Sequence, residues 1–525
     1  MKIKTTLKTL FLLIVFLPLG ILAQDGSLDA NFGLGGIAYT NVGSDTNFVN
    51  PAYSLALQID GKIVVSGNKY NGNNYDFATV RFNSNGSLDT SFGTNGMVIT
   101  NFEGNDIAKS VAIQSDGKIL VTGINATGVG SSKFALFRYN PNGSLDTTFD
   151  FDGIFTSNFN GGDCNALAIS IQNDGKIILA GDARNGSGFS GFACRRLISN
   201  GSLDSTFGTN GKVFTLFESA GATADSANSV SIQSNGKIVL TGSSFKYNIG
   251  GGGTNRFAAL RYNSNGSLDN TFDNDGKVIT TFGIFGDEGT SLALQNDGKI
   301  LIGGNSAVAN FGTEVFAIVR LNVDGSLDTT FDNDGKVTTL IGTFMDRLFS
   351  TIIQNDGKIL VSGYSNSLSN NVFTLVRYNT DGSLDTSFDM DGIVNSISDS
   401  SAYLGAYSLA LQTDGKIVAA GLLNNSLAVV RLNNPSLSDN SFENRNAFSI
   451  NPNPFSKETV IQTENFFENA SLLVYNSMGQ LVKTINNING QSITVSRDNL
   501  PSGLYFVNLT QENRTIGIEK LLIAD

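Results

Sequence analysis

Residues 77–100 read FATVRFNSNGSLDTSFGTNGMVIT, and this stretch decides the fold. It contains an apolar run that ends in Arg81, then a Gly-Ser-Leu-Asp segment, then a Phe-Gly pair before a second apolar run. The Gly-Ser-Leu-Asp tetrapeptide recurs every 57 to 65 residues along the chain, and a recurrence of this length indicates a repeat architecture. The seven copies begin at Gly26, Gly86, Gly143, Gly201, Gly266, Gly325 and Gly382.

Two further markers recur seven times in the same order. One is Gln-x-Asp/Asn-Gly-Lys-Ile, and the other is an arginine at the end of an apolar run. A decayed copy of the tetrapeptide at residues 435–438 marks the end of the array. The chain therefore holds seven copies of one unit. The glutamines are Gln58, Gln114, Gln172, Gln233, Gln295, Gln354 and Gln412, and the arginines are Arg81, Arg138, Arg196, Arg261, Arg320, Arg377 and Arg431.

The turn residues of the first unit predict four strands, at residues 37–40, 53–58, 62–66 and 77–83. Asp60-Gly61 predicts a hairpin with a type I′ turn. The strands are apolar on both faces, so each sheet needs another sheet on either side of it. A propeller and a linear solenoid both provide this, and four strands in each unit favour the propeller. We therefore predict an all-β fold, a seven-bladed β-propeller of four-stranded blades over residues 24–433.

The composition is that of a folded protein, because 40% of the 525 residues are hydrophobic. A net charge of −12 argues against nucleic acid as a partner, since that would require clustered lysines and arginines. The chain has no histidine, which excludes Ser–His–Asp triads and histidine-based metal sites. Cys164 and Cys194 are the only cysteines, and they either form one disulfide or act as two small buried hydrophobic residues.

The N-terminus is typical of a signal peptide. Lys2, Lys4 and Lys8 precede an apolar run at residues 10–22. Small residues after this run predict cleavage between Ala23 and Gln24, so that the signal peptide covers residues 1–23. A retained transmembrane anchor is the alternative, but the run is short for a membrane span. We expect no transmembrane anchor after processing.

Each recurring arginine needs a partner, because an unpaired buried charge costs about 3–5 kcal/mol. An aspartate lies eight residues after each arginine, and we predict a bidentate pair within a blade or between neighbouring blades, with a structural role. A ring of ligand-binding arginines is the functional alternative. Asp29 belongs to the first tetrapeptide and has no arginine before it. The aspartates at the eight-residue interval are Asp89, Asp146, Asp204, Asp269, Asp328, Asp385 and Asp439.

Residues 25–433 resemble the delta-60 repeat family, whose units follow the pattern GSLDxxFGxxG…QxDGKIxxxG…FxxxRYNxDG. The resemblance implies a bacterial protein, often secreted or at the cell surface, with a propeller-like arrangement. It implies no shared activity.

Four units carry Asp-x-Asp-Gly directly after the recurring phenylalanine. Alternating carboxylates beside a glycine are candidate calcium ligands. The other three units have glycine in place of the first aspartate, so the turn forms without these carboxylates. We therefore favour a plain turn with no metal or other cofactor. The candidate aspartates are Asp150, Asp152, Asp273, Asp275, Asp332, Asp334, Asp389 and Asp391.

The loops of an antiparallel blade alternate between two faces of the propeller. The Asp-Gly and Gly-Ser-Leu-Asp turns share one face and hardly vary between units, whereas the loops on the other face vary in length and sequence. Variable loops on a rigid scaffold commonly bind ligands. We predict a ligand surface there, with Tyr70, Tyr75, Phe245 and Tyr247 as aromatic contacts.

The repeat pattern gives way to a linker at residues 434–446 and a C-terminal domain at 447–525, whose short strands predict a small immunoglobulin-like β-sandwich. This domain resembles the type A sorting domain of the type IX secretion system of Bacteroidetes. The matching segments are NPNPF at 451–455, VYNSMGQ at 474–480, LPSGLY at 500–505 and KLL at 520–522. The resemblance implies the secretion machinery as a partner and a secreted or surface-attached location, often with removal of the domain.

We predict a non-enzymatic binding module for an unknown glycan or protein, with no catalytic residue. One alternative is a polysaccharide-active propeller enzyme with paired carboxylates. It would need a repeat-breaking cluster of Asp, Glu, Tyr or Arg at the axis, and the units look too uniform to provide one. The other alternative is a purely structural, adhesin-like spacer.

Overall fold

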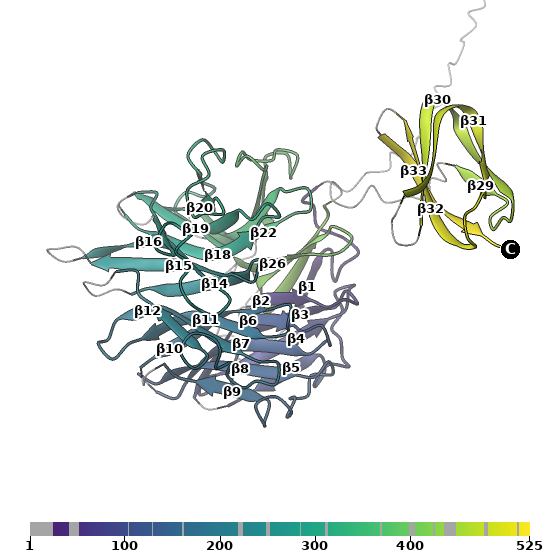
Figure 1. Cartoon of the computed structure of the whole chain (residues 1–525). Coiled ribbons are helices and arrows are strands. Elements are labelled where there is room, and N and C mark those ends of the chain that lie inside the picture. The colour runs from purple at the N-terminus through teal and green to yellow at the C-terminus, as the bar shows by residue number, and fades with distance from the viewer. Residues whose placement is uncertain are drawn as a thin grey trace, which may run out of the picture. The chain divides into compact units, whose positions relative to one another are not determined.

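The computed structural model contains only β-strands as regular structure in the residues that it describes (Figure 1). The strands fall into two compact units, residues 1–438 and 439–525. In the described residues no helix is long and apolar enough to cross a membrane. The predicted signal peptide and its cleavage site lie outside the described residues, which are 25–40, 52–102, 104–128, 130–159, 162–218, 224–247, 252–283, 285–309, 313–367, 370–397, 405–423, 426–434, 448–476, 481–511 and 514–525.

The first unit consists of seven blades, each an antiparallel sheet of four strands. Blade 1 holds β2 (Ala52–Leu57), β3 (Ile63–Tyr70), β4 (Tyr75–Phe82) and β5 (Met97–Thr100). Blades 2 and 3 hold β6 (Asn105–Ile113), β7 (Ile119–Ala126), β8 (Ser132–Tyr139), β9 (Ile154–Ser157), β10 (Cys164–Ile171), β11 (Ile177–Arg184), β12 (Ser190–Leu197) and β13 (Lys212–Thr215). Blades 4 and 5 hold β14 (Ser226–Ile232), β15 (Ile238–Tyr247), β16 (Gly253–Tyr262), β17 (Lys277–Thr280), β18 (Asp287–Leu294), β19 (Ile300–Ala309), β20 (Thr313–Leu321) and β21 (Lys336–Thr339). Blades 6 and 7 hold β22 (Met345–Ile353), β23 (Ile359–Ser367), β24 (Asn370–Tyr378), β25 (Ile393–Ile397), β26 (Gly405–Leu411), β27 (Ile417–Leu423), β28 (Ser426–Leu432) and β1 (Ile37–Thr40).

The blades form a closed ring, and this confirms the predicted seven-bladed propeller. The innermost strand of each blade contacts the innermost strand of the next, and β26 of the last blade contacts β2 of the first. These seven strands therefore surround the axis of the ring. A single parallel bridge between Glu314 and Met345 also links the sheets of blades 5 and 6.

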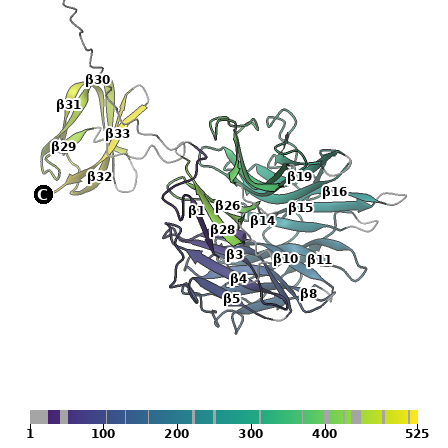
Figure 2. The same cartoon turned by 180° about the vertical axis from the view of Figure 1, so that it is seen from behind.

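The two ends of the array share one blade. β1 pairs antiparallel with β28, with Ile37 opposite Val430, and Figure 2 shows the purple β1 beside the green β28. The sequence assigned residues 37–40 to the same sheet as the three strands that follow them. The structure places them instead as the outermost strand of blade 7, so each sheet is offset by one strand from the sequence unit.

The hairpin at Asp60-Gly61 differs from the predicted type I′ turn. Gly61 has a positive φ of 79°, but Asp60 is absent from the residues with positive φ. The N–H of Gly61 donates to the carbonyl of Gln58 at 2.9 Å, and the N–H of Gln58 donates to the carbonyl of Lys62 at 2.8 Å. This pattern is a three-residue loop, a type I turn followed by a left-handed glycine. The longer loop needs only one positive φ, so aspartate fits before the glycine.

The cores of the propeller lie between neighbouring blades. One cluster joins Ile63, Val65 and Val80 of blade 1 to Val418 and Val429 of blade 7. Both faces of a blade are therefore buried, which explains why the strands do not alternate between apolar and polar residues. Cys164 and Cys194 are both buried and free, so they act as small hydrophobic residues and not as a disulfide.

The second unit is a small β-domain. Its strand order is β29-β30-β32-β33, and β31 also pairs with β30. Two of its strands, β30 and β31, are long, with 19 and 16 residues, where the sequence predicted short strands. Phe455, Ile461, Val474, Tyr505 and Leu521 belong to its core. The bounds are β29 (Ser449–Asn451), β30 (Glu458–Asn476), β31 (Leu481–Ser496), β32 (Gly503–Gln511) and β33 (Arg514–Ile523).

Candidate functional site

The recurring arginines are buried at the side of the propeller where the Asp-Gly turns lie, which we call the uniform face. In blade 2, Arg138 Nε donates to Asp146 Oδ2 at 2.7 Å, and its guanidinium lies 4.4 Å from the centroid of the Phe149 ring. Arg138 Nη1 donates to the carbonyl of Ser199, in the next blade, at 2.5 Å. The same Nε–Oδ2 contact, at 2.6 to 2.8 Å, joins Arg81 to Asp89, Arg196 to Asp204, Arg261 to Asp269, Arg320 to Asp328, Arg377 to Asp385 and Arg431 to Asp29.

The pairs differ from the predicted bidentate geometry. Only Nε of Arg138 reaches the carboxylate, because Nη1 binds the next blade and Nη2 faces Thr148 Oγ1 at 3.3 Å. The guanidinium therefore joins two blades, which a bidentate pair within one blade would not do. The arginine–aspartate pairs therefore join neighbouring blades, and we assign no ligand to them.

A lysine that the sequence reasoning overlooked completes most of these clusters. Lys237 Nζ lies 2.7 Å from Asp269 Oδ2 and belongs to the recurring Gln-x-Asp/Asn-Gly-Lys-Ile marker. Burial raises the pKa of Asp269, but hydrogen bonds from Lys237, Thr271 and Arg261 outweigh it and hold that pKa below its usual value. The lysine is present in all seven copies of the marker, and this recurrence was the signal from which its role could have been predicted. Corresponding contacts join Lys118 to Asp146, Lys176 to Asp204, Lys299 to Asp328, Lys358 to Asp385 and Lys416 to Asp29.

Ring closure decides the partner of the last arginine. Arg431 was predicted to meet Asp439, which lies outside the described residues. In the structure Arg431 Nε donates to Asp29 Oδ2 at 2.8 Å, so the first tetrapeptide supplies the missing aspartate. The first and last strands of the array share blade 7. Arg431 and Asp29 are 402 positions apart in the chain, but they form the pair that residues eight positions apart form in the other blades.

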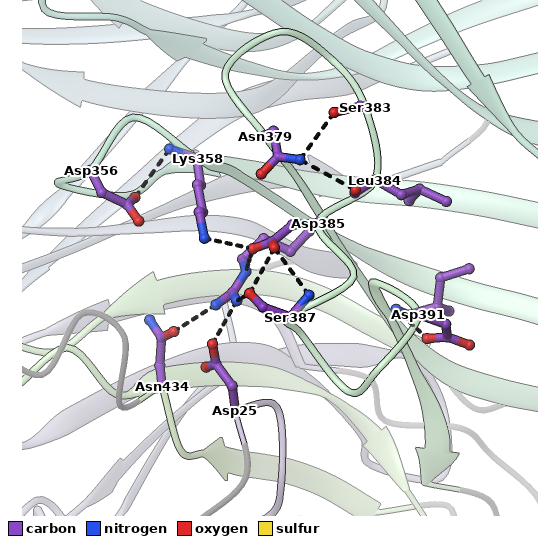
Figure 3. Close-up of polar contacts among 12 residues, drawn as sticks. Asp25, Asp356, Lys358, Asn379, Ser383, Leu384, Asp385, Ser387, Asp391 and Asn434 are labelled. Carbon is purple, nitrogen blue, oxygen red and sulfur yellow. Dashed lines mark hydrogen bonds and ion pairs between the residues drawn. The ribbon is translucent and has the colours of Figure 1, made fainter.

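The neighbouring blade boundary, between blades 6 and 7, has an additional ion pair. Arg377 is fully buried, and its Nη2 donates to Asp25 Oδ2 at 2.6 Å (Figure 3). Its Nη1 donates to Asn434 Oδ1 at 2.8 Å. One side chain thus binds residues from both ends of the described propeller.

In each Asp-x-Asp-Gly turn, the carboxylate of the second aspartate binds within the turn. Asp152 Oδ1 accepts the N–H of Ile154 at 2.8 Å, and the backbone N–H of Asp150 donates to the carbonyl of Asn200 at 2.8 Å. No group of three acidic or sulfur ligands suited to a metal occurs in the part of the chain that the structure describes. Asp275, Asp334 and Asp391 accept N–H groups as Asp152 does, while Asp273, Asp332 and Asp389 occupy the place of Asp150.

The predicted aromatic contacts lie on the opposite side, which we call the variable face. Tyr70 and Tyr75 flank the turn between β3 and β4, with ring centroids 5.3 Å apart. Phe245 and Tyr247 lie near the end of β15, with centroids 4.7 Å apart. The two pairs belong to blades 1 and 4, and the structure does not bring them together in one site. Tyr247 is 54% exposed.

The sequence reasoning missed seven positions next to the axis. Each innermost strand has a β-bulge, for example between Ala52 and Ser54 of β2, which leaves Tyr53 outside the regular ladder. We call the bulged residues the axial positions. They break the repeat, because the units place different residues there. The axial residues are Tyr53, Lys109, Leu167, Asn228, Thr290, Phe349 and Tyr407, and each is half-buried.

Two axial positions are occupied by polar residues that bind the next blade. Asn228 Nδ2 donates to the carbonyl of Gly289 at 2.7 Å. Thr290 Oγ1 donates to the carbonyl of Leu348 at 2.7 Å. These side chains contribute to the scaffold.

Blades 6, 7, 1 and 2 place an aromatic arc at the axial positions. The Phe349 and Tyr407 rings stack with centroids 4.7 Å apart, and Tyr407 meets Tyr53 edge-on at 5.9 Å. Lys109 Nζ lies 4.4 Å from the centroid of the Tyr53 ring. Burial raises the pKa of Tyr53, with a contribution from Tyr75, and raises the pKa of Tyr407 to about 12. Both phenols therefore remain protonated and able to donate hydrogen bonds. We call Phe349, Tyr407, Tyr53 and Lys109 the axial arc.

A charged cluster continues the arc on its blade 6 side. Tyr364 lies 5.8 Å from Phe349, centroid to centroid. Arg347 donates from Nε and Nη2 to the two carboxylate oxygens of Glu314, at 2.7 and 3.0 Å. Burial raises the pKa of Glu288, and the charge of Arg347 only partly offsets it. The other units do not repeat these charged residues.

A polar cavity of about 370 Å³ is also present among blades 2 to 4. Its lining includes Asp163, Asp182 and Asp225. Burial raises the pKa of Asp182 to about 6, although Asn165 Nδ2 donates to its carboxylate at 3.0 Å.

Comparison with known families gives two matches. The family described as "Domain of unknown function (DUF5122) beta-propeller" matches seven segments, and "Secretion system C-terminal sorting domain" matches residues 449–524. No curated protein matches the chain. The seven propeller segments are residues 58–92, 114–149, 172–207, 233–272, 295–331, 354–388 and 412–442.

Solved structures give fold-level similarities of low identity. A polysaccharide lyase of family PL25, an ulvan lyase, is 14% identical with a TM-score of 0.43, over 76% of this chain and 95% of that one. Sqt1 of Chaetomium thermophilum, bound to the N-terminus of ribosomal protein L10, is 10% identical with a TM-score of 0.40, over 78% and 100%. The extracellular domain of a putative hybrid two component system from B. thetaiotaomicron is 12% identical with a TM-score of 0.35, and the match covers 93% of this chain but 57% of that one. At these values none of the three indicates a function.

Proposed function

We propose that this chain, which belongs to the DUF5122 beta-propeller family and ends in a secretion system C-terminal sorting domain, is an exported binding protein that holds its ligand on the variable face of the propeller. The sorting domain places the protein at the cell surface or outside the cell and indicates handling by the type IX secretion system. The ligand is therefore a molecule that is accessible outside the cell.

The contrast between the two faces supports this proposal most strongly. On the uniform face, the seven units repeat the same arginine, aspartate and phenylalanine, and their contacts join blade to blade. On the variable face, the units differ both in their loops and at the axial positions. The blades fold alike whichever axial residue they carry, so blade structure does not require the aromatic rings there. Recognition of a ligand supplies a reason for them.

The proposal is tested with the mature chain, residues 24–525, against a glycan array and in pull-down experiments with extracellular proteins of the source bacterium. Saturable binding without turnover is the expected result. A chain that binds neither glycans nor proteins would favour the purely structural spacer and contradict the proposal.

A second candidate, a polysaccharide-active enzyme, is supported by the carboxylates of Glu288 and Glu314. Glycoside cleavage uses two carboxyl groups, one of which is kept protonated by its surroundings. Burial raises the pKa of Glu288, whereas Glu314 is held by Arg347. Release of new reducing ends, abolished in Glu288→Gln, would establish this candidate over the binding module. An unsubstituted chain that binds a glycan but releases no reducing ends would exclude it.

A further inference from the structure

The axial arc is placed where four neighbouring blades meet the ring axis. Phe349, Tyr407, Tyr53 and Lys109 come from the innermost strands of blades 6, 7, 1 and 2. Each is half-buried and touches the next residue of the arc. Three rings in contact therefore form one continuous aromatic surface that spans three blades.

The scaffold does not need this surface. Blades 4 and 5 place Asn228 and Thr290 at the same position, and there the side chain binds the backbone of the next blade. Inter-blade contact at the axis also has a second source, since Ser408 Oγ accepts the N–H of Leu55 at 3.1 Å. An aromatic ring supplies neither of these hydrogen bonds. Its advantage is a flat face for stacking, with phenol groups at the edge.

Lys109 adds a charge to the arc. Burial lowers the pKa of Lys109, and no carboxylate among the described residues counters this effect. Its ammonium group instead lies against the Tyr53 ring. The lysines of the Gln-x-Asp/Asn-Gly-Lys-Ile turns, in contrast, have aspartate partners, as Lys237 has Asp269. In a chain with a net charge of −12, a half-buried lysine without an acidic partner in the described region is suited to an anionic group of a ligand.

We infer that the axial arc binds an acidic polysaccharide, with pyranose rings stacked on Tyr407, Phe349 and Tyr53 and a carboxylate or sulfate of the glycan paired with Lys109. A pyranose has a flat C–H face that packs on an aromatic ring and hydroxyls that bond to phenol groups. This inference rests on the proposed function and names its site and ligand class.

Calorimetry of the mature chain with three probes tests the inference: polygalacturonate oligosaccharides, sulfated galactan oligosaccharides and neutral xylo-oligosaccharides. At least one acidic probe should bind, more tightly than the neutral probe and less tightly as salt is added. The first two probes distinguish a carboxylate ligand from a sulfate ligand. Failure of both acidic probes to bind would overturn the inference.

Variants locate the site. Lys109→Met should weaken binding of the acidic probe roughly tenfold or more, the usual loss for a charged hydrogen bond, while Lys109→Arg retains most of it. Tyr53→Ala and Tyr407→Ala should weaken binding by a similar factor, and Tyr53→Phe by less. Tyr39→Ala is the matched control, because it removes an exposed tyrosine from β1, the outermost strand of blade 7, and should leave affinity unchanged. Circular dichroism and Tm establish that each variant is folded.

Two results would separate this inference from the proposed function. If the acidic probe binds and the arc variants bind it as tightly as the parent chain, the site lies elsewhere and the inference is wrong, but the binding module stands. If only a protein partner binds, the ligand class is wrong and the module again stands. If the parent chain binds neither a glycan nor a protein, by contrast, the proposed function itself is wrong.

Discussion

Replacing Arg431 by methionine should destabilise the pairing of β1 with β28 that closes the ring, while the other blade boundaries stay intact. Arg431 binds the buried carboxylate of Asp29 at 2.8 Å and the carbonyl of Ser84 in blade 1 at 2.6 Å. Its guanidinium also lies 4.5 Å from the Phe32 ring centroid. Methionine keeps most of the apolar packing but removes the charge and both hydrogen bonds.

The expected cost follows from what remains around Asp29. Removing one partner of a buried ion pair costs about 3–5 kcal/mol. Lys416 Nζ stays 2.9 Å from Asp29 Oδ2 and keeps the carboxylate partly neutralised, so we expect the lower end, about 3 kcal/mol. The loss falls on the segment that carries Asp29 and continues into β1, which four residue pairs hold against β28.

Hydrogen exchange of the β1 amides measures this local effect, and urea unfolding measures the global one. Exchange of β1 should become roughly 100-fold faster, the factor that about 3 kcal/mol implies. Arg138→Met is the matched control, because Arg138 has the same three contacts and Lys118 Nζ lies 3.0 Å from Asp146. The control should lose comparable global stability and keep β1 protected. Equal exchange of β1 in the two variants would refute the reasoning.

Three further predictions concern pH, a buried acid and the thiols. The folded-state pKa values of Asp146, Asp269, Asp328 and Asp385 lie well below the ordinary 3.8, so their stabilisation is complete above pH 3.8 and is lost as the pH falls from 3.8 towards the folded-state values. As far as these aspartates are concerned, urea midpoints should stay level from pH 5 to pH 4 and fall steeply from pH 4 to pH 2, and a flat profile below pH 4 would contradict the assignment. Burial raises the pKa of Asp182 to about 6, so its contribution to stability is present below pH 3.8 and is lost as the pH rises through 6. Asp182→Asn should therefore gain about 3 kcal/mol at pH 8 and nothing at pH 3.5, and an equal gain at both pH values would show that charge is not the cause. Cys164 and Cys194 are free and buried, so a reducing agent should leave Tm unchanged. Thiol titration should detect two thiols only after the protein is unfolded. A Tm that falls on reduction would reveal a disulfide.

The axial arc shows what an analysis of the repeats can overlook. Each axial residue lies five positions before the glutamine of the Gln-x-Asp/Asn-Gly-Lys-Ile marker, as Tyr53 precedes Gln58. Aligning the units on that glutamine would have exposed the variation. Its meaning was hidden, because the sequence does not show that a bulge at this point removes the residue from the ladder and places it at the axis.

The sequence by itself determined the number of blades and the arginine–aspartate interval, because both are local properties that repeat within every unit. It also determined the export domain, whose motifs are contiguous stretches such as residues 451–455. Only the tertiary structure decided that Arg431 binds Asp29, that Arg377 joins Asp25 to Asn434, and that the aromatic residues of three blades meet at the axis. These contacts arise because the ring closes, and closure brings together residues that no interval along the chain relates to one another.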